Sequence, residues 1–293
     1  MKNLYLTLIF LQAFLINAQL PEFEIYSSKL EINNGVTQVT DVINLTNHDG
    51  YDNQPSFSPD GKLLYFSSIR DNIQADIYAI DMSDRSTKQI TNTAESEYSP
   101  VFTSDGNSFT VVRVEKDSVQ RMWEFVKNGT TQKVILPKID SIGYYCKIDD
   151  KRYAFFMVTE PPAMVVADIK KQTTITIDKN IGRCIKRIPG ENAISYIFKK
   201  SDNQWVIKKY DLNKNMISII SLIPAISEDF IWTSDKNLIM ARNNQFWMYN
   251  YKSENPEWKM ISEIQELKDK KIYRLALSPD GVTLAFVADE GSN

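Results

Sequence analysis

The sequence is poor in the residues that most often build metal and nucleophilic sites. It contains one histidine, His48, and two cysteines among 293 residues. A zinc site built from several histidines and a two-histidine relay are therefore excluded. A Ser-His-acid triad would have to use His48, and the chain has no Gly-x-Ser-x-Gly sequence to supply the nucleophile. We interpret His48 as an ordinary loop residue and expect no peptidase activity.

The two cysteines, Cys146 and Cys184, are too few for a disulfide framework. An oxidising compartment would permit a bond between them. Free cysteine is also among the most buried residue types, so we interpret both as small buried strand residues. At this point both alternatives stay open.

Long apolar runs are absent except at the amino terminus. Residues 4–16 are almost entirely apolar, follow the charged Lys2 and precede the small residue Ala18. This is the arrangement of a secretory signal peptide, and a run of about 13 residues is shorter than the roughly 20 that a membrane-spanning helix needs. We therefore predict a signal peptide over residues 1–18 with cleavage near Ala18. The mature protein is expected to be periplasmic or secreted, with no membrane span.

The sequence also lacks a basic excess and an internal linker. Its formal net charge is −3, which becomes −3 − 1 = −4 when Lys2 is removed with the signal peptide. A nucleic-acid-binding protein would show a basic excess or a clustered Lys/Arg face, so we expect no nucleic-acid partner. No Gly-, Ser- or Pro-rich stretch divides the chain, and all-β domains often exceed about 200 residues. Residues 19–293 are therefore predicted to form a single domain, which we expect to be a monomer.

A repeated turn motif is the most informative feature that is present. Ser58-Pro59-Asp60-Gly61 recurs as Thr103-Ser104-Asp105-Gly106 and as Ser278-Pro279-Asp280-Gly281. Acidic residues at positions 60, 105, 150, 191, 235 and 280 divide the chain at steps of 45, 45, 41, 44 and 45 residues. The motif is typical of tight hairpin turns, in which Pro, Asp and Gly each favour the required backbone angles. A period of about 40 to 45 residues is typical of propeller blades.

Short β-branched and aromatic runs follow each of these turns. Strands are expected at 63–66, 76–81, 87–91, 123–126, 133–136, 164–167, 174–177, 205–208, 216–219, 246–249, 258–261 and 283–287. Residues 23–31 and 38–43 flank the turn Asn33-Asn34-Gly35 and have the pattern of two outer strands. We therefore predict an all-β fold, a six-bladed β-propeller with four-stranded antiparallel blades. Its ring is closed by the N-terminal strands, which complete the last blade and protect sheet edges.

The stretch from Pro55 to Asn92 also resembles a known family. It begins Pro-Ser-Phe-Ser-Pro-Asp-Gly-Lys and continues with Ser67-Ser68-Ile69-Arg70, Asp76-Ile77-Tyr78 and Gln89-Ile90-Thr91-Asn92. This resembles the repeat of the periplasmic TolB-like propellers and of the propeller half of dipeptidyl and prolyl oligopeptidases. Units three to five keep the spacing but lack the Pro-Asp-Gly turn. The resemblance implies a propeller that serves as a protein-docking platform, a cover on a hydrolase, or occasionally an enzyme or glycan binder.

The loops that enter each unit are rich in tyrosine and carboxylates, and in propellers such loops gather around one mouth of the central channel. The candidate partner-binding residues are Tyr51, Asp52, Glu97, Tyr98, Tyr144, Arg183, Glu228, Asp229 and Tyr273. Tyrosine with a few charged neighbours is typical of recognition surfaces. The alternative is that the tyrosines pack the inner strands while the acids are merely solvated.

Three candidate functions from different classes are compatible with the sequence. We expect a non-catalytic binding or scaffold protein that docks a protein or peptide partner. A carbohydrate-active enzyme is the alternative, because carboxylates about 5 to 10 Å apart can hydrolyse glycosidic bonds. A glycan-binding module would instead use Trp123, Trp205, Trp232, Trp247 or Trp258, most of which lie in predicted strands.

No catalytic residue and no cofactor is assigned. A Ca²⁺ ion held by Asp, Glu and Asn oxygens is the alternative to a metal-free protein. No ligand loop with a defined spacing is present to support that site.

Overall fold

The computed structural model describes residues 22–33, 36–70, 74–130, 132–224 and 227–290. The predicted signal peptide and Asn34-Gly35 of the first predicted turn lie outside these ranges. Within them, no helix is long and apolar enough to cross a membrane.

Almost all regular structure in these ranges is β-strand, as the repeat predicts; the exception is a short 3-10 turn, η1 (Gln265–Leu267). Four sheets each contain four antiparallel strands that are consecutive in the chain. These strands are β7 (Ser96–Phe102), β8 (Ser108–Val114), β9 (Gln120–Val126) and β10 (Gln132–Val134); β11 (Ile142–Lys147), β12 (Arg152–Met157), β13 (Ala163–Asp168) and β14 (Thr173–Lys179); β15 (Ile181–Arg187), β16 (Ala193–Ser201), β17 (Gln204–Asp211) and β18 (Met216–Leu222); and β19 (Phe230–Trp232), β20 (Asn237–Arg242), β21 (Gln245–Asn250) and β22 (Trp258–Glu263).

The remaining strands form one sheet that joins the two ends of the described chain. They are β1 (Phe23–Asn33), β2 (Val36–Asn44), β3 (Tyr51–Phe57), β4 (Leu63–Ile69), β5 (Asp76–Asp81), β6 (Thr87–Gln89), β23 (Ile272–Leu277) and β24 (Thr283–Asp289). Their order is β23-β24-β1-β3-β4-β5-β6, with β2 paired to β1.

The contact between β1 and β3 is a single parallel pair, Phe23 with Tyr51. By contrast, β1 and β24 pair antiparallel from Phe23 opposite Asp289 to Lys29 opposite Thr283. The amino-terminal strands therefore pair with the carboxy-terminal hairpin, as the sequence analysis predicts.

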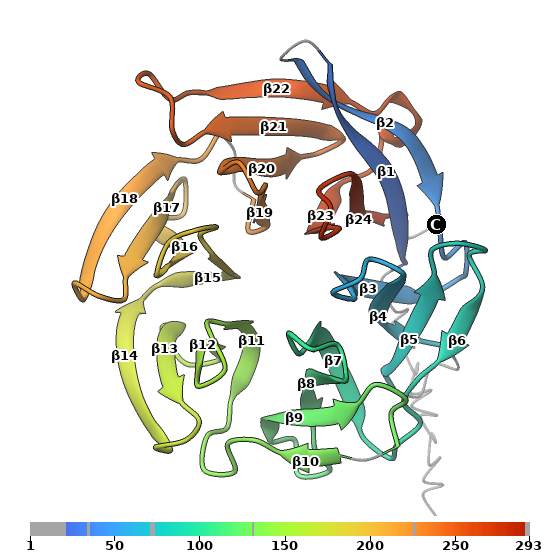
Figure 1. The fold of residues 1–293 in the computed structure, drawn as a ribbon, viewed down its shortest axis with the longest axis vertical. Coiled ribbons are helices and arrows are strands. Elements are labelled where there is room, and N and C mark those ends of the chain that lie inside the picture. Colours follow the sequence, from blue (N-terminus) through green and yellow to red (C-terminus); the bar gives the residue numbers. More distant parts are fainter. Residues whose placement is uncertain (1–21, 34–35, 71–73, 131, 225–226, 291–293) are drawn as a thin grey trace, which may run out of the picture.

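Figure 1 shows the sheets arranged around a common centre. The innermost strands are β3, β7, β11, β15, β19 and β23, and the fourth strand of each four-stranded sheet lies at the periphery. Each sheet faces a neighbour on either side, so its central strands are buried on both faces.

Strand β4 shows this double burial. Leu64 and Phe66 pack against Ile25 of β1 on one side, whereas Tyr65 packs against Phe102 and Phe109 of the next sheet. All of these side chains are almost or fully buried. Because successive side chains of a strand point to opposite faces, burial on both faces requires a continuous apolar run rather than an alternating one. This explains the uninterrupted apolar runs that mark each unit in the sequence.

The repeated motif forms the predicted turns. The Ser58 hydroxyl donates to Asp60 Oδ1 at 2.6 Å, and the same oxygen accepts the Lys62 N–H at 3.2 Å. Gly61 has φ of 71°, in the region that favours glycine. The same hydroxyl-to-Asp contact is present at Thr103 and Ser278, which explains why Ser or Thr, Asp and Gly recur together before β4, β8 and β24.

Three local expectations are wrong. Strand β6 ends at Gln89, two residues before the expected end at position 91. The turn of the third unit uses Asp149, whose Oδ1 accepts the N–H groups of Lys151 and Arg152 at 2.9 Å, and Asp150 is exposed instead. Strand β10 ends at Val134, two residues earlier than expected, because Leu136 is fully buried in the core between two sheets and leaves the hydrogen-bond ladder.

Candidate functional site at the central cavity

The tyrosines that were assigned to entry loops lie within the innermost strands. Tyr51 begins β3, Tyr98 lies in β7, Tyr144 in β11 and Tyr273 in β23. Their assignment to loops is therefore wrong. Strand pairing extends through these polar segments because the inner edge of each sheet faces the centre, where polar side chains need no apolar partner.

Irregular pairing distinguishes the start of these strands. The registers of β3, β7 and β23 with their neighbours shift next to Gln54, Ser99 and Arg274. These three residues have φ of 60°, 55° and 49°, which is uncommon for residues other than glycine. Such β-bulges redirect side chains at sheet edges. The Gln54 side chain accepts the Ser99 N–H at 2.8 Å and thereby connects β3 to β7.

A cavity of about 460 Å³ lies at the centre of the molecule and is referred to below as the central cavity. Residues of all six innermost strands line it. Among the predicted site residues, Tyr144, Arg183 and Asp229 line this cavity. Its volume is within the range of about 300 to 1,000 Å³ that is typical of ligand pockets.

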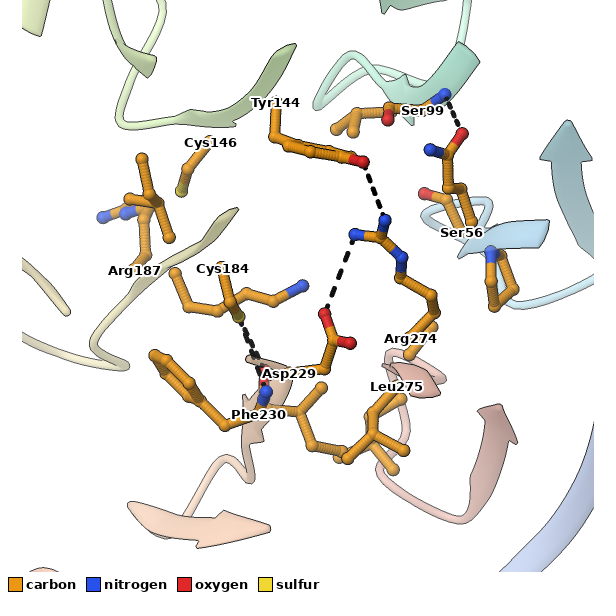
Figure 2. Close-up of a pocket in the computed structure, with 18 of the residues that line it drawn as sticks. Ser56, Ser99, Tyr144, Cys146, Cys184, Arg187, Asp229, Phe230, Arg274 and Leu275 are labelled. Carbon is orange, nitrogen blue, oxygen red and sulfur yellow. Dashed lines mark hydrogen bonds and ion pairs between the residues drawn. The ribbon is translucent and has the colours of Figure 1, made fainter. Parts of the chain in front are cut away.

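Asp229 is the centre of a network of polar side chains. Its Oδ2 atom lies 2.6 Å from Arg183 Nη2, and its Oδ1 atom lies 3.7 Å from Arg274 Nη1. Arg274 in turn donates to the Tyr144 hydroxyl at 2.8 Å, and its guanidinium carbon lies 4.6 Å from the centre of that ring. Figure 2 shows Tyr144, Arg274 and Asp229 pointing toward one another in the cavity.

The charge state of Asp229 follows from these contacts. Burial by itself raises the pKa of this carboxyl group, but Arg274 and Arg183 outweigh burial and lower the pKa below its ordinary value. Asp229 therefore stays ionised near neutral pH and is a weak proton acceptor. Its role is to hold two arginines rather than to transfer protons.

Glu228 extends the network toward β16. It lies 3.5 Å from Arg183 Nη1 and forms an ion pair with Lys199. The Lys199 ammonium group lies 4.6 Å from the centre of the Trp205 ring. Glu228 and Asp229 are thus both neutralised by neighbouring cations.

Asp52 and Glu97 do not line the central cavity. The Asp52 carboxylate is 1% exposed and lies 3.2 Å from Arg70. Glu97 is fully buried, lies 3.0 Å from Arg113 Nε, and accepts hydrogen bonds from the hydroxyls of Thr93 and Thr91 at 2.6 and 3.1 Å. Burial raises the pKa of Glu97 to about 7. Asp52 and Glu97 are both buried, so the alternative that these acids are merely solvated is wrong for both.

The remaining predicted residues, Tyr51, Tyr98 and Tyr273, are partly buried. Burial raises the pKa of Tyr51, and Arg274 lowers it while Tyr144 and Tyr98 raise it further. Burial also raises the pKa of Tyr273. These tyrosines lie close enough to the Arg/Asp network to feel its charges, and Phe23 contacts both Tyr51 and Tyr273 edge to face.

The cavity lining contains cations that the sequence analysis did not identify. They are Lys147, Lys186, Arg187 and Arg274, which join Arg183, whereas Asp229 is the one carboxylate of the lining residues in the described chain. The sequence gives only a weak signal for these cations. Lys147, Lys186 and Arg187 lie on inner strands of units that lack the repeated turn motif, and Arg274 lies at a β-bulge.

The cysteines also lie on the inner strands. Cys146 of β11 is partly buried, Cys184 of β15 is buried, and both thiols are free. Burial raises the pKa of the Cys184 thiol to about 11, and its sulfur lies 3.4 Å from the Phe230 carbonyl oxygen. Both are strand residues, as predicted, but only Cys184 is buried as expected.

His48 lies between β2 and β3, where its backbone N–H donates to Glu24 at 2.8 Å. This location agrees with the interpretation of a loop residue. In the part of the chain that the structure describes, no three His, Cys, Asp or Glu side chains are grouped so that they could hold a metal ion.

Among known proteins, this chain is similar in fold to several solved structures. No protein-family model matches the chain, and the search of curated proteins gives no match. A structure assigned as TolB from Agrobacterium tumefaciens superposes with a TM-score of 0.70 at 11% identity, over 93% of this chain and 99% of that one. TolB from Acinetobacter baumannii gives 0.57 at 13% identity, over 92% and 64%. An oligogalacturonate lyase in complex with manganese gives 0.56 at 14% identity, over 85% and 79%. The chain therefore has the fold of the TolB-like β-propellers.

Proposed function

We propose that this protein is an exported, non-catalytic binding propeller that docks a protein or peptide at the mouth of its central cavity. In this proposal the eight-stranded sheet is two four-stranded blades that touch through Phe23 and Tyr51. The propeller then has six blades, and the pairing of β1 with β24 closes its ring. Residues 1–18 act as a signal peptide. Residues 19–293 form one propeller domain in the periplasm or outside the cell.

The observation that carries the proposal is the convergence of six separate strands on one cavity whose lining includes Tyr144, Arg183 and Arg274. Tyrosine and arginine are enriched where binding energy concentrates in protein interfaces. We assign partner contact to Tyr51, Tyr98, Tyr144, Arg183, Glu228, Asp229 and Tyr273. Asp52 and Glu97 support this surface from beneath, since their ion pairs with Arg70 and Arg113 anchor the first strands to the second.

The test begins with the chain from Gln19 onward, immobilised and exposed to envelope extract of the producing organism. A captured protein is then purified, and its affinity is measured directly. The Tyr98→Ala/Tyr144→Ala double variant is expected to weaken that affinity at least about tenfold, because each truncated contact residue costs about 1 to 2 kcal/mol. The matched control is Tyr251→Ala, a partly buried tyrosine that does not line the central cavity. Equal affinities for the double variant and the control would contradict docking at this mouth.

A second candidate is an enzyme or binding module that acts on an acidic glycan. It is favoured by the cationic cavity and by the similarity in fold to a structure described as an oligogalacturonate lyase. Two observations weigh against it. Asp229 is held by two arginines, and the Tyr144 ring has one face against Arg274 and so offers less area for stacking on a sugar. Incubation with oligogalacturonate, followed by chromatography of the products, tests this candidate, and chain cleavage would establish it in place of the binding proposal.

A further inference from the structure

The central cavity carries a charge opposite to that of the whole protein. The chain has a formal net charge of −3, yet the cavity lining includes three lysine or arginine residues on β11 and β15, Lys147, Lys186 and Arg187, in addition to Arg183 and Arg274. Asp229 is the one carboxylate of the lining residues in the described chain and offsets Arg183 and Arg274 only in part; Glu228, which also pairs with Arg183, is shared with Lys199. The cavity is therefore a local positive site on an acidic protein.

In the part of the chain that the structure describes, two of these cations have no carboxylate partner. Within the described ranges, no carboxylate oxygen lies within 4.0 Å of Lys186 or Arg187, whereas Lys147 lies 2.9 Å from the exposed Asp150. Their charges act inside the cavity, because both lower the pKa of the Cys146 thiol, which burial raises overall. Lys186 is partly buried and Arg187 is exposed. Cations that line a concave site attract anions more strongly than cations on an open surface do.

We propose that the occupant of the central cavity is an acidic peptide segment of the partner, whose carboxylates pair with Lys186 and Arg187. This inference rests on the proposed function and adds the chemistry of the partner. A peptide is favoured over an acidic sugar because the same lining contains partly buried apolar side chains, among them Val101, Ala276 and Leu277. Its aromatic rings offer little area for sugar stacking: Tyr145, Phe230 and Trp232 are buried, Arg274 lies against Tyr144, and Phe57 is partly buried.

The probe is hexaglutamate with a fluorescent label, and its binding to the chain from Gln19 onward is followed by fluorescence anisotropy. Labelled hexaglutamine is the neutral control, and hexagalacturonate is the acidic-sugar control. We expect hexaglutamate to bind, hexaglutamine not to bind, and the affinity to fall as salt is raised. The Lys186→Gln/Arg187→Gln variant is expected to weaken binding roughly fivefold to thirtyfold, since each of the two partly exposed ion pairs contributes about 0.5 to 1 kcal/mol.

The matched control is Lys170→Gln/Lys252→Gln, which removes two charges from exposed positions outside the cavity. Equal loss of affinity in the two variants would overturn the inference, because it would show an effect of net charge alone. Tighter binding of hexagalacturonate than of hexaglutamate would also overturn it and assign the cavity to an acidic glycan. Circular dichroism of each variant confirms that it is folded.

A competition experiment separates this inference from the proposed function. Hexaglutamate is expected to displace the captured partner from the immobilised chain. If Tyr98 and Tyr144 prove necessary for the partner but hexaglutamate does not compete, docking at the mouth stands and the acidic peptide in the cavity is wrong. If substitution of these tyrosines leaves partner binding unchanged, the proposed function itself fails.

Discussion

Arg183 of β15 and Asp229, immediately before β19, form an ion pair across neighbouring sheets, with 2.6 Å between Nη2 and Oδ2. Arg274 approaches the same carboxylate from β23 on its other side, at 3.7 Å. One acidic side chain thus holds together basic side chains from two other sheets. Two like charges near each other repel, and an opposite charge placed between them offsets that repulsion. Asp229 is therefore expected to stabilise the centre of the protein as well as to shape its cavity.

We predict that Asp229→Asn lowers the free energy of unfolding by about 2 to 4 kcal/mol, because it removes the carboxylate beside the poorly hydrated Arg274 and leaves Arg183 with the more distant Glu228, at 3.5 Å. The same variant should bind hexaglutamate more tightly, since it removes the negative charge from the cavity lining. Urea unfolding and anisotropy measure the two effects. Asp202→Asn, at an exposed position, serves as the control and should change neither. A loss of both stability and hexaglutamate affinity would argue against a cationic binding site.

The pH dependence of stability should report the burial of Glu97. Its pKa is about 7 in the folded protein, against an ordinary value of 4.5. Between these values the folded state holds a proton that the unfolded state has released, so the stability contributed by this group is lost as pH rises from 4.5 to 7. The loss is at most about 3 kcal/mol. We predict a smaller change between pH 5 and pH 8 for Glu97→Gln than for the parent protein in denaturant unfolding.

Glu254→Gln, at an exposed position, is the control for this measurement and should keep the parent pH profile. An unchanged profile for Glu97→Gln would show that Arg113 holds Glu97 ionised throughout this range.

The pairing of the two chain ends should contribute strongly to stability. Ile25 of β1 is fully buried against Leu64, Phe66 and Val287, so Ile25→Ala should cost about 2 to 5 kcal/mol. Ile32 lies on the same strand but is 61% exposed, and Ile32→Ala should change stability by no more than about 0.5 kcal/mol. Urea denaturation of the two variants gives the comparison. Similar costs would contradict the docking of β1 into the core beside β24.

Two glycines with nearly the same backbone angle should respond very differently to alanine. Gly281 has φ of 77° and no neighbouring atom within 4 Å of an added Cβ, so Gly281→Ala should cost only about 1 to 2 kcal/mol from the backbone angle. At Gly129, with φ of 79°, an added Cβ would lie 2.0 Å from the Ile90 carbonyl oxygen. Thermal unfolding should show a clearly larger loss for Gly129→Ala, since this turn contacts the backbone of the neighbouring sheet. Equal losses would mean that the β9–β10 turn can move away from Ile90.

Much of the fold was predictable because it depends on local patterns. The Ser58-Pro59-Asp60-Gly61 turn is stabilised by contacts within five residues, and the apolar run of β4 reflects burial on both faces. The third unit departed from the expected turn because Asp149 and Asp150 are both able to accept the backbone N–H groups. Sequence alone does not choose between two adjacent aspartates.

The site was less predictable because its contacts join distant parts of the chain. Tyr144 and Arg274 are 130 residues apart, and nothing in either segment marks the other as its partner. The carboxylates illustrate the same difficulty. Asp52, Glu97 and Asp229 recur in similar positions in their units, yet Asp52 of β3 and Glu97 of β7 are buried away from the cavity and Asp229 lines it.

By itself the sequence determined the all-β class, the period of the repeat and the identity of its turns, because these depend on backbone preferences and on neighbours a few residues away. Only the tertiary structure decided which residues face the centre. One β-bulge changes the face to which a side chain points, and the arrangement of six strands around an axis decides which charges meet. For this reason Lys186 and Arg187, inconspicuous in the sequence, line the central cavity, whereas the conspicuous Glu97 is a buried ion-pair partner.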